Sequence, residues 1–298
     1  MLHLERLRVL DAVAVHGSLA RAARALHITP SGVSQQLARL ERESGHRLTT
    51  PHGRSVRLTH AGRVLAEHAA RVVAEARAAE SDLADLGEEI LGPLRLGGVG
   101  SPLRALLPYA LAGLTAAHPR LIPTLVDGEV VDLLPRLLSG ELDLLIIESW
   151  TNRPMPLPEG LVLSPLADEP VHAALSAHHP LADADSVELG ALDGVLWTSC
   201  PAGTEPYEAL VQAVRAAGGE PEVRYTVTEF ATQLALVAQG LAAALVPEMG
   251  QRPAPPGVRF VPTDPPLRRE VYAAWRAGAE SPSVRACVDA LTESAARA

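Results

Sequence analysis

Residues 17–45, "GSLARAARALHITPSGVSQQLARLERESG", constrain the fold most, because they set two short helices on either side of a very tight turn. Gly17 ends a first helix, whose apolar residues from Leu4 recur at helical spacing, and Ser18 can cap the next helix. Residues 26–28 are too few for anything but a turn. The stretch therefore predicts three short helices in succession.

The helix after this turn carries an unusual polar face. Thr29 is a favourable N-cap, and Pro30 fits the first helical position because its missing N–H is not needed there. Apolar side chains at i, i+4 and i+7 bury one face, and polar side chains occupy the rest: Ser31, Ser34, Gln35, Gln36 and Arg39. Short hydroxyls let a helix N-terminus approach phosphates, while glutamine and arginine can read base edges in the major groove. The pattern predicts a helix-turn-helix.

The charge is distributed unevenly along the chain. The net charge is −9, yet residues 1–63 hold ten arginines against four acidic residues, a balance of +6. Residues 96–298 hold thirteen arginines against twenty-four acidic residues, a balance of −11. A basic head on an acidic body is typical of a polyanion-binding module attached to another domain.

Residues 47–62, "RLTTPHGRSVRLTHAG", alternate polar and apolar positions around a glycine and predict a short basic hairpin. A hairpin in this place is a wing, able to touch the DNA backbone or minor groove with Arg54 and Arg57. An amphipathic helix pair that merely faces water is the alternative, and the wing argues against it.

These segments resemble the LysR-type transcriptional regulators, whose pattern appears as "GSLARAARALHITPSGVSQQLARLERESGHRL" followed by "RSVRLTHAG". The resemblance implies backbone contacts from Ser31, Ser34 and Arg54, and base-proximal positions for Thr29, Pro30 and Gln35. With the helix cap and the exposed arginine, the expected DNA-binding set is Ser18, Thr29, Pro30, Ser31, Ser34, Gln35, Arg39 and Arg54. One departure concerns residues 48–51: "LTTP" lacks the family's phenylalanine and arginine, so wing packing and phosphate contact should differ.

Residues 60–91 predict one long helix with an apolar seam. Eight positions alternate in steps of four and three: Leu65, Ala69, Val72, Ala76, Ala79, Leu83, Leu86 and Ile90. Such a heptad seam is typical of a dimerisation helix. The alternative is a helix that packs on its own domain. Gly92-Pro93 is expected to end the helix and form a hinge.

The remaining chain alternates strands and helices in two sets, which predicts parallel sheets covered on both faces. The expected fold class is an N-terminal all-α winged helix-turn-helix with a long linker helix, followed by a C-terminal α/β two-lobed effector domain. The resemblance implies that this domain is like a periplasmic binding protein. The expected domains are residues 1–59, a linker at 60–92 and an effector domain at 93–298. Its first lobe comprises about 93–166 and 267–298, and its second about 167–266.

Ligands of α/β domains lie at the carboxyl ends of strands, so these ends give the candidate effector site. The set is Gly100, Ser101, Pro102, Asp127, Glu129, Glu148, Thr198, Ser199, Cys200, Thr226, Thr228 and Phe230. Hydroxyls at helix N-termini suit a carboxylate, whereas Glu129 and Glu148 would oppose an anion or favour an amine.

The function predicted from these features is a sequence-specific, DNA-binding transcriptional regulator modulated by a small molecule, and not an enzyme. Its expected partners are an interrupted palindromic operator, a small-molecule co-inducer and further copies of itself, as a dimer through the linker helix and a tetramer. No resident cofactor, catalytic residue or metal site is expected, and the expected location is cytoplasmic, at the bacterial nucleoid. The alternatives are an α/β enzyme and a solute-binding protein. An enzyme is disfavoured because the sequence contains no known nucleophile or phosphate-binding motif. A peroxide sensor based on Cys200 is a third alternative, although no second cysteine lies nearby in the sequence.

Overall fold

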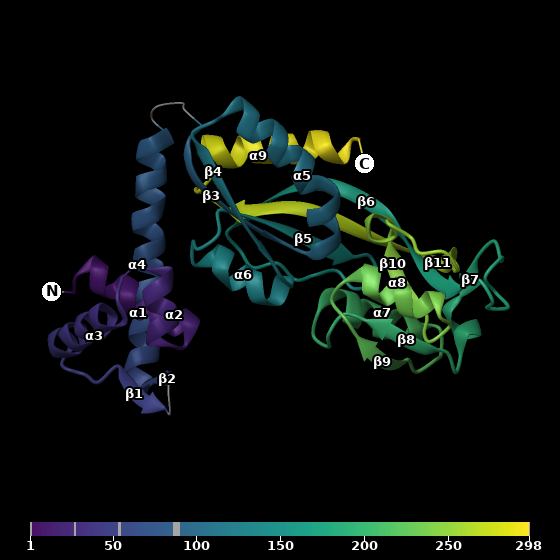
Figure 1. The fold of residues 1–298 in the computed structure, drawn as a ribbon, viewed down its shortest axis with the longest axis horizontal. Coiled ribbons are helices and arrows are strands. Elements are labelled where there is room, and N and C mark those ends of the chain that lie inside the picture. Colours follow the sequence, from purple (N-terminus) through teal and green to yellow (C-terminus); the bar gives the residue numbers. More distant parts are fainter. Residues whose placement is uncertain (1, 27, 53–54, 86–89, 298) are drawn as a thin grey trace. The chain divides into compact units, whose positions relative to one another are not determined.

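The computed structural model describes residues 2–26, 28–52, 55–85 and 90–297 (Figure 1). It forms two compact units, Met1–Gly87 with Ser139–Glu141 and Glu88–Leu138 with Leu142–Ala298. We call the part of the first unit from α1 to α4, including its hairpin, the head, and the second unit the body.

The head contains three helices, a hairpin and a long helix: α1 (Leu4–His16), α2 (Leu19–Ala25), α3 (Pro30–Ser44), β1 (Thr49–His52), β2 (Ser55–Leu58) and α4 (His60–Asp85). The two helix caps lie where the sequence predicts them. Ser18 accepts a hydrogen bond from the Arg21 N–H, and Thr29 accepts one from the Gly32 N–H at 3.1 Å. Leu10, Val33 and Leu40 are fully buried in the head's core.

β1 and β2 form the expected antiparallel hairpin, with Pro51 opposite Val56. Although the family's phenylalanine is absent, the hairpin is held to α3, because the Glu41 carboxylate accepts the Leu48 N–H at 2.8 Å. The start of α4 lies directly against this segment: a Cβ on Gly62 would come within 2.0 Å of the Leu48 carbonyl oxygen. A glycine at position 62 is therefore required by close backbone contact.

The first half of α4 packs on its own domain, against α1, with Ala66, Ala69 and Val73 buried in the head's core. For this half of α4, the alternative interpretation, a helix that packs on its own domain, is therefore correct. The expected seam remains partly open, since Val72 is 46% exposed and Ala79 is also exposed. The side chain of Leu83 and the whole of Leu86 lie outside the described residues.

The first lobe of the body is a sheet with helices on both faces. Its elements are β3 (Gly92–Gly98), α5 (Gly100–Ala117), β4 (Leu121–Asp127), α6 (Val130–Leu138), β5 (Leu144–Trp150) and α9 (Pro282–Ala295). β3 is parallel to β4 and β5. Alternating side chains of β5 divide between a core under α5 and α9 and another under α6. The prediction of a hinge at Gly92-Pro93 was wrong, because both residues are already paired in β3.

The second lobe has the expected strand and helix order, with β8 parallel to β9. Its elements are β7 (Val187–Glu188), η1 (Leu189–Leu192), β8 (Leu196–Ser199), α7 (Glu205–Ala216), β9 (Glu222–Thr226), α8 (Phe230–Ala238), β10 (Ala244–Pro247) and η2 (Glu248–Gly250).

Two long antiparallel strands, β6 (Leu161–Ser176) and β11 (Val258–Arg276), lie side by side through both lobes (Figure 1). They make a sheet of order β10-β6-β11-β5-β3-β4, in which β11 is antiparallel to β5 and β10 is antiparallel to β6. The expectation of purely parallel sheets was therefore wrong for this half of the sheet. None of the helices in the described part of the chain is long and apolar enough to cross a lipid bilayer.

Candidate functional site

The outer face of α3 presents the polar side chains that the sequence singles out. Thr29, Pro30, Ser31, Ser34, Gln35 and Arg39 are all exposed. The Thr29 and Ser31 hydroxyls share a hydrogen bond of 3.0 Å at the helix N-terminus. Gln35 and Arg39 are four residues apart, so they lie on one side of the helix. The helix thus offers two hydroxyls at its N-terminal end, followed by two side chains long enough to reach a base edge.

The other two expected DNA contacts stand apart from this face. Ser18 is half-buried, and its hydroxyl already accepts the Arg21 N–H at 3.4 Å. Arg54 lies outside the described residues. Several further exposed arginines of the head were not selected from the sequence, among them Arg21, Arg24 and Arg42. Arginines on a helix surface carry no local signal that separates a phosphate contact from ordinary solubility.

A small, half-open cavity of about 30 Å³ lies in the body where the two lobes meet. Space of this size holds about two water molecules. Seven of the residues expected from strand ends line it: Gly100, Ser101, Glu129, Glu148, Cys200, Thr228 and Phe230. The carboxyl ends of the strands therefore lie at the edge of the sheet where this cavity is found.

The other five expected residues do not line the cavity. Pro102, Thr198 and Ser199 are buried elsewhere, while Asp127 and Thr226 are exposed. The strand-end rule identifies a segment, but successive side chains of a strand point to opposite faces. The residues that the sequence argument missed are Val99, Arg104, Pro206, Glu229 and Arg269. Arg104 is three residues after Ser101 on α5, and this helical spacing is the signal that would have found it.

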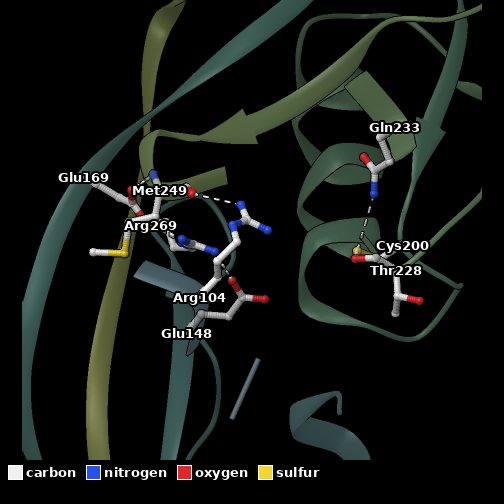
Figure 2. Close-up of polar contacts among 8 residues, drawn as sticks. All are labelled: Arg104, Glu148, Glu169, Cys200, Thr228, Gln233, Met249 and Arg269. Atoms are coloured by element: carbon white, nitrogen blue, oxygen red, sulfur yellow. Dashed lines mark hydrogen bonds and ion pairs between the residues drawn. The ribbon is translucent and has the colours of Figure 1, made fainter. Parts of the chain in front are cut away.

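A buried ion network forms one wall of the cavity (Figure 2). Arg269 donates to Glu148 Oε2 at 2.8 Å and, through Nε, to Glu169 Oε1 at 2.8 Å, and its Nη2 also pairs with Glu169. Glu169 Oε2 accepts the Met249 N–H at 2.6 Å. The side chains of Arg269, Glu148 and Glu169 are only 1%, 3% and 6% exposed. The network therefore ties β5, β6, β11 and η2 together at the cavity.

Arg104, the other arginine of the lining, is also engaged. Its Nη2 donates to the Met249 carbonyl oxygen at 3.2 Å (Figure 2). The same atom donates to the Arg252 carbonyl oxygen at 3.0 Å. Both cations of the cavity therefore have protein partners.

Two carboxylates of the cavity, Glu129 and Glu148, hold protons more tightly than usual. Burial, followed by the charges of Glu148, Asp127 and Asp132, raises the pKa of Glu129 from 4.5 to about 7. Burial also raises the pKa of Glu148, and the neighbouring Arg269 only partly offsets this effect. The site is thus acidic and poorly hydrated.

Cys200 is a buried thiol with two hydrogen-bond contacts (Figure 2). Its Sγ donates to the Thr228 carbonyl oxygen at 3.5 Å and accepts from Gln233 Nε2 at 3.7 Å. Burial, then the charges of Glu129 and Glu148, raises the pKa of this thiol far above its ordinary value. Because the thiolate is the reactive form of cysteine, the surroundings of Cys200 suppress its reactivity.

One hydroxyl of the lining is left unpaired. Ser101 Oγ is buried at the N-terminal end of α5 and has no hydrogen-bond partner among the described residues. A buried polar atom without a partner is costly, so this hydroxyl is available to a guest in the cavity. Across the described ranges, no three His, Cys, Asp or Glu side chains gather closely enough to hold a metal ion.

A small helical head with an exposed polar helix, joined to a two-lobed α/β body with an internal polar cavity, defines a ligand-responsive DNA-binding regulator. Comparison with known families agrees. Residues 87–296 match the LysR substrate binding domain, and residues 4–63 match the bacterial regulatory helix-turn-helix protein of the lysR family. The chain belongs to the LysR family. Its members are DNA-binding transcriptional regulators that respond to small-molecule effectors, so this chain is a regulator and not an enzyme.

Relatives and solved structures cover nearly the whole chain. The transcriptional regulator TtuA of Agrobacterium vitis is 29% identical over 88% of this chain and 85% of its own length. The dual regulator OxyR of Escherichia coli is 28% identical over 93% of this chain and 90% of its own. A full-length OxyR variant from Pseudomonas aeruginosa has a similar fold, with a TM-score of 0.73 at 24% identity, covering 99% of this chain and 95% of that one. Full-length CbnR in complex with its target DNA has a TM-score of 0.64 at 22% identity, covering 98% and 100%.

Proposed function

We propose that this regulator acts in the bacterial cytoplasm as a homodimer, or as a tetramer made of two such dimers, that reads an interrupted palindromic operator with α3. A small molecule in the cavity of the body sets its activity. The observation that carries the proposal is the exposed polar face of α3, where hydroxyls at the helix N-terminus precede Gln35 and Arg39.

The expected contacts divide into two kinds. Ser31 and Ser34, near the N-terminal end of α3, suit phosphate oxygens, which position the helix but carry little sequence information. Thr29 and Pro30 are expected at base-proximal positions. Gln35 and Arg39 project further along the same helix and suit base edges. Arg57 on the exposed side of β2 is placed to contribute to the electrostatic, salt-dependent part of binding.

Operator titration of single variants tests this division. Arg39→Ala should weaken specific binding by more than the loss of one positive charge explains. Arg8→Ala is the matched control, since Arg8 is also exposed but lies on α1 and pairs with Glu5. Equal losses in the two variants would mean that Arg39 acts only through its charge, and that α3 is not the reading helix.

Dimerisation through α4 is supported by the part of the seam that the head leaves uncovered. Val72 is 46% exposed, although it belongs to an apolar repeat. Val64, also on α4, is 45% exposed but lies off the seam. An apolar residue repeated at heptad spacing is favoured where a partner helix covers it.

These two valines give a matched test. Val72→Glu puts a charge into the proposed interface of both copies, and two buried like charges are strongly unfavourable. We expect Val72→Glu to halve the mass measured by light scattering and to abolish specific DNA binding, while Val64→Glu changes neither. A Val72→Glu variant with unchanged mass would place the dimer interface elsewhere. Leu83→Glu is expected to act in the same way as Val72→Glu.

The chemistry of Cys200 argues against a peroxide as the effector. Several relatives carry the name hydrogen peroxide-inducible genes activator. Peroxide sensing requires a thiolate that is accessible, and commonly a second cysteine to form a disulfide. Here the Cys200 thiol is buried next to two carboxylates, and Cys287, the other cysteine, is buried in a separate core under α5 and α9. A reversibly bound small molecule therefore fits this cavity better than an oxidant.

A further inference from the structure

We propose that the effector of the cavity is a cation that presents a protonated amine to Glu129, an inference that rests on the effector-binding role proposed for the same cavity. Neither the family match nor the relatives' names specify the charge of the ligand. The inference comes from which charged groups of the cavity are already paired and which are left free.

Glu129 is the carboxylate that is left free. Glu148 is neutralised by Arg269, and Glu229 accepts a hydrogen bond from Thr232 at 3.1 Å. The Glu129 carboxylate lines the cavity, is partly buried, and has neither an ion pair nor a hydrogen bond within the described part of the chain. A buried carboxylate without a partner is unfavourable unless it is protonated or meets a cation.

The charges of the lining disfavour a carboxylate ligand, because three carboxylates, Glu129, Glu148 and Glu229, line the cavity with two arginines. Arg269 is already paired with Glu148 and Glu169, and Arg104 directs its Nη2 at two carbonyl oxygens. The N-terminus of α5 attracts anions, but it is equivalent to only about half a positive charge. When Glu129 is ionised, its negative charge outweighs that half charge, so the cavity then favours a cation.

The neutral groups of the lining also suit an amine. An ammonium group has three donors and no acceptor. The unpaired Ser101 Oγ and the Thr228 hydroxyl are oxygen acceptors in the same cavity as the Glu129 carboxylate. The cavity of about 30 Å³ has room for a small ammonium group.

The protonation of Glu129 gives the proposal a second signature. Its pKa of about 7 means that a proton occupies the carboxylate in acid solution, and an ammonium ion must replace that proton. Affinity for the amine should therefore be constant above about pH 8 and fall about tenfold per pH unit below about pH 6. The charged or titratable groups that face Glu129, from its own segment and from the elements around it, are Asp127, Asp132, Glu148, Cys200, Glu229, Arg104 and Arg269.

The test adds three probes of nearly equal size to the full-length protein. Binding of each probe is measured as a change in melting temperature at constant ionic strength. The probes are methylammonium, its neutral isostere methanol, and formate. We expect methylammonium to raise the melting temperature, with saturation, and the other two to leave it unchanged. Glu129→Gln should weaken methylammonium binding about tenfold, the loss expected for one charged hydrogen bond. Glu188→Gln, an exposed carboxylate outside the cavity, should leave methylammonium binding unchanged.

The outcomes separate this inference from the proposed function. Stabilisation by formate but not by methylammonium would overturn the inference and leave an effector cavity in place. Equal methylammonium shifts in the original protein and in Glu129→Gln would overturn it as well. If none of the three probes changes the melting temperature, both the inference and the assignment of the cavity fail.

Discussion

Replacing Glu129 by glutamine should stabilise the protein at pH 8 and do much less at pH 5. In the folded protein the pKa of Glu129 is raised from 4.5 to about 7, so the folded state binds a proton that the unfolded state releases. The stability due to this proton is fully present below pH 4.5 and is lost as the pH rises through 7. Glutamine stays neutral at every pH and avoids that loss.

The size of the effect follows from the two pKa values. One pKa unit corresponds to about 1.4 kcal/mol, so the rise from 4.5 to about 7 sets an upper limit of about 3 kcal/mol. Because the Glu129 side chain is only partly buried, solvent screening reduces this figure to about 1–2 kcal/mol. For a body of this size, that raises the melting temperature by about 2–8 °C at pH 8. At pH 5 about a quarter of the effect remains.

Scanning calorimetry of the original protein and of Glu129→Gln at pH 5 and pH 8 measures this difference. Glu188→Gln is the control and should shift neither melting temperature, since its carboxylate is exposed. A Glu129→Gln variant that is less stable at pH 8, or whose melting temperature rises equally at both pH values, would refute the claim that burial disfavours the ionised Glu129 carboxylate.

Three further changes have defined outcomes. Arg269→Met leaves Glu148 and Glu169 buried without their cation and should lower the free energy of unfolding by about 3–5 kcal/mol in urea titration; adding Glu169→Gln should recover part of the loss, and no recovery would contradict the pairing. Cys200 should react with a thiol reagent far more slowly in the folded chain than in urea, and comparable rates would refute its protection. Pro51→Arg adds a cation to the exposed first strand of the wing and should tighten DNA binding in gel-shift titration, whereas equal or weaker binding would show that β1 stays away from the phosphates.

The head could be predicted from the sequence because each of its signals is local. The Ser18 and Thr29 caps, the proline at the start of α3 and the glycine that ends α1 each act within four residues. The packing of α4 was not predictable in the same way. Its sequence carries two apolar faces side by side, and only contact with α1 shows that Ala66 and Val73, which lie off the seam, are buried together with Ala69 of the seam.

In the body, the alternation of strands and helices was predictable, but the full length and the pairing of the crossing strands were not. β6 contains Pro165 and Pro170, which argue against a strand, and its partner β11 lies about a hundred residues away. The buried Arg269 was missed for a related reason. An arginine in a strand is expected on the exposed face, and only the pairing with Glu148 and Glu169, brought together by tertiary structure, explains its burial.

Selection of bound sequences from random double-stranded DNA by the full-length protein tests the central claim most directly. The account predicts enrichment of an interrupted palindrome whose half-sites lie about one helical turn, or a multiple of it, apart. Gln35→Ala should then relax the preference at one position in each half-site, while Arg8→Ala keeps the whole motif. Enrichment of no motif, or of the same motif by Gln35→Ala and Arg39→Ala as by the original protein, would contradict the assignment of α3 as the helix that reads DNA.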